Sequence, residues 1–116
     1  MFKTPITTDS FFAEVLAANL YLKLIDQINK DFNLANERTN LPSSTTPYDL
    51  KIFLQNKVHK LIIHKFDSYL NLLYIIDVPE NTINSLDDID VEALSAEVAF
   101  LILKREWQKV WFRNRF

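Results

Sequence analysis

The sequence predicts an all-α fold, an antiparallel up-down-up bundle of three long helices within a single domain at residues 1–116. Three long segments carry apolar residues at the three- and four-residue spacing of amphipathic helices, and no segment alternates as a strand does. A chain of 116 residues that is 48% apolar has the size and composition of one globular domain. The chain has no glycine, which excludes glycine-rich phosphate loops, dinucleotide-binding turns and nucleophile elbows.

The first helix is expected over about residues 10–33, with Thr8 or Asp9 as its N-cap. A linker over residues 36–45 follows, rich in Asn, Ser, Thr and Pro. Asn33 or Asn36 can supply the left-handed residue with which a helix commonly ends, a position that glycine usually occupies.

The second helix is expected over about residues 47–76 and has the clearest start signal in the chain. Thr46 provides a capping hydroxyl, Pro47 suits the first helical position and Asp49 places an acid in the first turn. Pro79 ends the segment. We expect its apolar face to comprise Leu54, Val58, Leu61, Ile62, Phe66, Tyr69, Leu73 and Ile76.

The third helix is expected over about residues 90–113, with a short extra helical turn before it at residues 81–88. Near its middle this helix is apolar on two sides, and one of those sides becomes basic toward its end. Acids gather at its start, so two antiparallel copies would pair each acidic end with the partner's basic end. The pattern predicts a homodimer, with a monomer or a complex with another protein as alternatives; the interface residues are Val98, Leu101, Ile102, Arg105, Lys109 and Arg113.

One charged residue falls within the apolar sector of each of the first two helices. Pairing these helices antiparallel about the linker brings Glu14 level with Lys65. Because burying a single charge is costly, we expect a buried Glu14–Lys65 ion pair with a structural role.

The segment Trp111-Phe112-Arg113-Asn114-Arg115 resembles the recognition helix of homeodomains, which carries Trp-Phe-x-Asn-Arg. The resemblance implies that Asn114 would read an adenine in the major groove. It covers five residues, and residues 98–104 read as unbroken helix where a homeodomain has a turn. Nucleic-acid binding through this basic and aromatic segment is therefore the alternative function, although a net charge of −2 does not favour it.

Residues that could carry catalysis are not grouped in the sequence. His59 and His64 are five apart, whereas a zinc pair on a helix needs a spacing of three or four, and the chain has no cysteine. The acids of residues 87–92 lack the glycine of a calcium-binding loop and suit a helix N-terminus instead. We therefore expect no catalytic, metal or cofactor site. With no export signal or membrane-length apolar run, we expect a cytoplasmic, non-enzymatic protein that associates with itself or with a protein partner.

Overall fold

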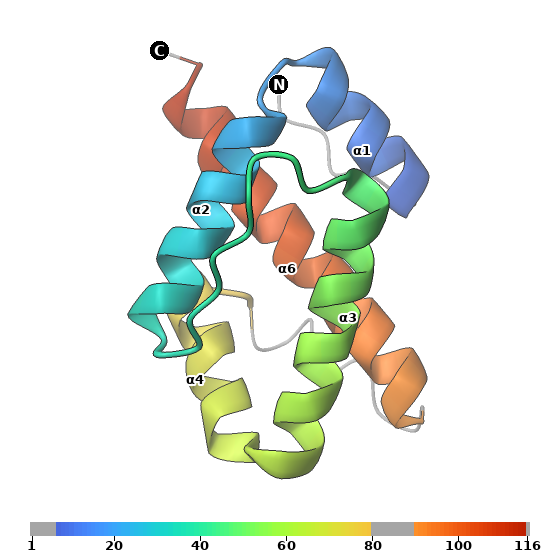
Figure 1. Ribbon diagram of the computed structural model, residues 1–116, viewed down its shortest axis with the longest axis vertical. Helices are drawn as coiled ribbons and strands as arrows, with labels where there is room; N and C mark the ends of the chain where they lie inside the picture. The colour runs from blue at the N-terminus through green and yellow to red at the C-terminus, as the bar shows by residue number, and fades with distance from the viewer. Residues whose placement is uncertain (1–6, 80–89, 116) are drawn as a thin grey trace.

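The computed structural model describes residues 7–79 and 90–115, which form five helices and no strand. In Figure 1, α6 (Val91–Arg113) passes through the middle of the molecule, behind α3 (Pro47–His64). α2 (Tyr21–Leu34) and α4 (Phe66–Ile76) cover one side of α6. α1 (Thr8–Ala17) packs on α6 with the rings of Phe11 and Phe100 edge to face, 6.1 Å apart between their centres. The most extensive contact between two helices is that of α3 with α6.

The all-helical prediction is confirmed for the described residues, but two of the three predicted helices are each divided in two. The helix predicted over residues 10–33 is interrupted after Ala17 and resumes at Tyr21. Asn19 adopts a left-handed conformation with φ 58°. The Leu20 amide donates to the Val15 carbonyl and the Asn19 amide to the Leu16 carbonyl, which together make a Schellman ending.

Asparagine and aspartate take the place of glycine at three helix ends. Asn19, Asn36 and Asp77 have φ values of 58°, 60° and 70°. After α2 the Glu37 amide donates to the Phe32 carbonyl, and after α4 the Val78 amide donates to the Leu73 carbonyl, the bonds of the same ending. The short polar side chains of Asn and Asp tolerate the left-handed region better than other residues with a Cβ atom. The predicted role of Asn36 is confirmed.

The prediction of one continuous helix over residues 47–76 was wrong, because the helix breaks at Lys65 and the chain turns back to form α4. Lys65 has φ −144° and ψ 64°, outside the helical region. A straight helix of that length would be about 45 Å long at 1.5 Å per residue, whereas the longest dimension of the molecule is 37 Å. Folding back at Lys65 therefore lets both halves pack on the same core.

The local start signals were more reliable than the predicted lengths. Thr46 Oγ1 accepts from the Asp49 amide at 3.1 Å, and Pro47 is the first residue of α3, as predicted. Asp90 Oδ1 accepts from the Ala93 amide at 2.8 Å and begins α6. α1 is capped one residue earlier than expected, by Thr7. The predicted short turn at residues 81–88 lies outside the described residues.

The linker over residues 36–45 is fastened to α2 by hydrogen bonds. Asn29 Oδ1 accepts from the Leu41 amide and from Thr39 Oγ1, both at 2.9 Å, and its Nδ2 donates to the Leu41 carbonyl. The Tyr21 hydroxyl donates to the Thr45 carbonyl at 2.7 Å. A single side chain of α2 thus satisfies three polar groups of a segment that has no regular structure.

Candidate functional site

Part of the surface that the sequence assigned to a dimer interface lies inside the chain. Val98 and Ile102 have 0% exposure, and Leu101 is partly buried against the core. α6 is apolar on two sides because other helices cover it on more than one side, so these positions do not need a partner molecule. Val98 and Ile102 are therefore not accessible in this fold, whereas Arg113 is exposed and the other three predicted interface residues are partly exposed.

The three basic residues of the predicted interface also make contacts within the chain. Arg105 Nη2 lies 3.0 Å from Asp77 Oδ2, and its Nε donates to the Asp77 carbonyl at 3.0 Å. Lys109 Nζ lies 2.7 Å from Asp31 Oδ2. Arg113 Nη1 donates to Gln27 Oε1 at 2.7 Å. These three basic residues form the basic ridge of α6, which was expected from the sequence to pair with the acidic end of a partner helix. The basic ridge instead ties α6 to α2 and to the end of α4.

The predicted Glu14–Lys65 pair is not formed. Lys65 sits at the break between α3 and α4 with its side chain 60% exposed, and its Nζ lies 3.4 Å from Glu37 Oε2. Glu37 is buried and also pairs with Lys57 at 3.0 Å. Glu37, which pairs with both lysines, thus belongs to the linker. Helical periodicity does not indicate where the linker lies on the helices.

Asn114, the base reader implied by the homeodomain resemblance, is engaged in ending α6. Its Nδ2 donates to the Val110 carbonyl at 2.8 Å, and its amide donates to the same carbonyl. α6 is continuous from Val91 to Arg113, without the turn that a homeodomain has before its recognition helix. The geometry therefore differs from that of the family at both points.

A pair of buried carboxyl groups and a lysine lies between α2 and α6, and the sequence analysis did not identify it. Glu106 is 0% exposed and Asp31 is 4% exposed. Lys109 Nζ contacts both, at 2.7 Å from Asp31 Oδ2 and 3.4 Å from Glu106 Oε1. The one available signal was position: Glu106 follows Ile102 by four residues and precedes Val110 by four, on the buried face of α6.

The two carboxyl groups have opposite pKa shifts. Burial raises the pKa of Glu106 to about 9; the neighbouring Asp31 adds to the rise, and Lys109 opposes it. Burial also acts to raise the pKa of Asp31, but hydrogen bonds from Glu106, Lys109 and Gln27 outweigh it, and that pKa lies below its ordinary value. Glu106 is therefore neutral at pH 7 while Asp31 is ionised.

The proton on Glu106 gives the pair its hydrogen bond. Two ionised carboxylates can only accept, and with Glu106 ionised neither of its oxygens has a hydrogen-bond donor of good geometry in the described part of the chain. A protonated Glu106 donates to Asp31 instead. Because Glu106 has no exposed surface, a substrate could not reach its carboxyl group without opening the core. This arrangement suits a structural contact between α2 and α6.

An apolar stripe lies on the outside of α4, and the sequence analysis placed one of its residues incorrectly. Phe66 was assigned to the buried face but is 54% exposed, and Leu70 and Tyr74 are 48% and 82% exposed. These three residues recur every four positions, so they share one face of the helix. The opposite face, with Tyr69, Leu72, Leu73 and Ile76, is buried. We call Phe66, Leu70 and Tyr74 the α4 stripe.

No protein-family model, curated protein or solved structure matches this chain. Within residues 7–79 and 90–115, no helix is both long enough and apolar enough to cross a bilayer. The same part of the chain brings no three histidine, aspartate or glutamate side chains into a group that could hold a metal ion. Any functional assignment therefore depends on the chain's own surface and charges.

Proposed function

We propose that this protein is a non-catalytic binding protein that associates through the α4 stripe, and that its partner is a second copy of the chain. The observation that carries the proposal is the exposure of Phe66, Leu70 and Tyr74 on one helical face. With aromatic side chains of about 150–250 Å² each, the two rings alone expose roughly 300 Å². That is the size of the largest apolar patch on a typical monomer before Leu70 is counted.

A second copy suits this stripe because the stripe is self-complementary. If two α4 helices pair antiparallel about Leu70, Phe66 of each copy lies opposite the partner's Tyr74. Lys65, at the start of α4, comes near the level of the partner's Asp77, at its end; both side chains are exposed. The helix dipoles are antiparallel as well, which favours the pairing.

The size of the stripe sets the strength of association that we expect. A stable interface buries about 800 Å² on each partner, and the α4 stripe supplies about half of that. We therefore expect a dimer that dissociates in the micromolar range rather than an obligate one. The antiparallel up-down-up bundle of three helices expected from the sequence is not confirmed, because the described residues form five helices.

The test uses two exposed leucines as a matched pair. Leu70→Lys places a charge in the α4 stripe, whereas Leu22→Lys makes the same change on α2, where Leu22 is 55% exposed. Light scattering across a concentration series should show dimerisation for the wild type and for Leu22→Lys, and a monomer for Leu70→Lys. Equal behaviour of the two variants would contradict the proposal.

A second candidate is binding of nucleic acid by the end of α6. The observation that favours it is an exposed group of Arg113, Arg115 and Phe112, with the Arg115 guanidinium 4.7 Å from the centre of the Trp111 ring. Such groups contact phosphates and stack on bases. This candidate predicts binding to a single-stranded oligonucleotide that weakens steeply as salt rises.

A further inference from the structure

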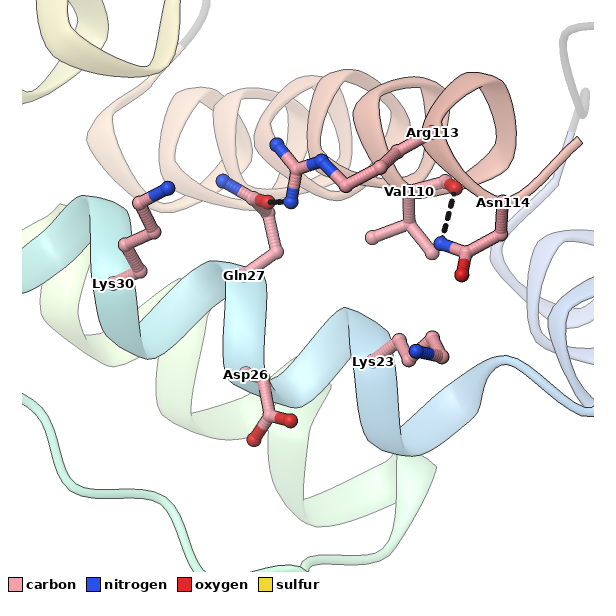
Figure 2. A pocket seen from close by; sticks show the side chains of 7 residues that line it. All are labelled: Lys23, Asp26, Gln27, Lys30, Val110, Arg113 and Asn114. Atoms are coloured by element: carbon pink, nitrogen blue, oxygen red, sulfur yellow. Dashed lines mark hydrogen bonds between the residues drawn. The ribbon is translucent and has the colours of Figure 1, made fainter. Parts of the chain in front are cut away.

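A hollow of about 210 Å³ lies between α2 and the last turn of α6. Its lining includes three cations, Lys23, Lys30 and Arg113, and one carboxylate, Asp26. Figure 2 shows Lys30 and Gln27 projecting from α2 toward α6, while Asp26 projects the other way. At about 30 Å³ per water molecule, the hollow has room for a tetrahedral oxyanion and part of its hydration shell.

The three cations of the hollow have no ion-pair partner among the described residues. By contrast, Lys109 and Arg105 of α6 each contact an acid. Lys23 and Lys30 are seven residues apart, so they lie on one face of α2 about 10 Å apart along its axis. Lys23 also stands in the first turn of α2, which has no acid and where the helix dipole is already positive.

Arg113 is held in place by a contact with α2. Its Nη1 donates to Gln27 Oε1 at 2.7 Å, as Figure 2 shows. Gln27 is 4% exposed and in turn hydrogen bonds to Asp31, which Lys109 also contacts. Because a guanidinium has five N–H donors, this contact leaves others available to a ligand. The buried contacts of α2 and α6 therefore orient an arginine that has donors available.

We propose that this hollow binds a phosphate group, with Arg113 as the bidentate donor and Lys23 and Lys30 as flanking charges. The planar fork of a guanidinium matches two phosphate oxygens, and lysine ammonium groups add charge without fixed geometry. A dianionic group would neutralise the excess of cations over Asp26 in the hollow. The proposal does not use the α4 stripe, so it stands or fails independently of dimerisation.

A phosphate group can come from a small phosphomonoester or from a nucleic-acid backbone, and the test separates these sources. Full-length ¹⁵N-labelled protein is titrated at low salt with inorganic phosphate, with adenosine monophosphate and with a short single-stranded oligonucleotide, each followed by amide chemical shifts. We expect saturable shifts at residues 27 and 113 below about 10 mM of a small probe. Arg113→Gln should weaken this binding about tenfold or more.

Lys60→Gln is the matched control, because Lys60 is an exposed lysine on α3, away from the hollow. It should bind as the wild type does, while Lys30→Gln, a second change within the hollow, should weaken binding in the same direction as Arg113→Gln. If only the oligonucleotide binds and Arg113→Gln weakens it, the site holds backbone phosphate. If no probe saturates, or if Arg113→Gln and Lys60→Gln behave alike, the proposal is overturned.

Discussion

Replacing Glu106 by glutamine tests the charge states assigned to the buried carboxyl pair. Glutamine keeps the shape of Glu106 and a donor for Asp31 but cannot ionise. The folded-state pKa of Glu106 is about 9, against an ordinary value of 4.5. Between these values the unfolded chain releases the proton and the folded chain keeps it, so the free energy of unfolding of the wild type falls as pH rises.

The expected size of this effect follows from the shift. A single such proton changes the free energy of unfolding by about 1.4 kcal/mol per pH unit. The shifted pKa of Glu106 lowers the free energy of unfolding of the wild type by less than about 1 kcal/mol at pH 5 and by about 3 kcal/mol at pH 7. Glu106→Gln does not lose this free energy, so its free energy of unfolding relative to that of the wild type should increase from pH 5 to pH 9.

The measurement is urea unfolding of both proteins at unit steps of pH between 5 and 9. A constant difference caused by imperfect amide geometry does not matter, since only the change with pH carries the inference. Glu97→Gln, an exposed position on the same helix, is the control and should track the wild type. A difference between Glu106→Gln and the wild type that stays the same across this range would refute the assigned protonation.

Two further predictions concern contacts that hold α2 to its neighbours. Lys109→Met leaves the Asp31 carboxylate buried without its cation and should lower the free energy of unfolding by about 3–5 kcal/mol at pH 7. The control Lys104→Met loses a contact with the Phe100 ring instead and should lower it clearly less. Equal losses for the two variants would contradict the Lys109–Asp31 pairing. Asn29→Ala removes three hydrogen bonds to the linker and should lower the free energy of unfolding by about 1–3 kcal/mol. Hydrogen exchange at the Leu41 amide should become faster. The control Asn56→Ala, at an exposed position on α3, should leave that amide protected.

Sequence-local signals predicted the starts of α3 and α6 correctly. Thr46 with Pro47, and Asp90 before α6, satisfy the first free amides of their helices with nearby residues, so no knowledge of packing was needed. The same holds for Asn36 at the end of α2. The break at Lys65 left no such signal. Buried positions continue at helical spacing across it, from Leu61 to Tyr69, so periodicity alone favours one helix.

The contacts between α2 and α6 join residues that are far apart in sequence. Lys109 and Asp31 are 78 residues apart, and Arg113 and Gln27 are 86 apart. Helical periodicity identified the basic ridge of α6 but not the acids and amide that meet it. The central position of α6 was likewise hidden, because an apolar surface on two sides suits both a dimer interface and a fully enclosed helix. The exposed position of Phe66 follows from the turn at Lys65.

The most direct test of self-association uses the absence of cysteine from the chain. Leu70→Cys introduces a single thiol at the proposed two-fold axis, and Leu22→Cys introduces one at an exposed site on α2. Under mild oxidation at micromolar protein, pairing through the α4 stripe predicts rapid formation of a covalent dimer by Leu70→Cys, read on a non-reducing gel, and little by Leu22→Cys. Equal rates for the two variants, or no dimer from Leu70→Cys, would contradict the proposed association.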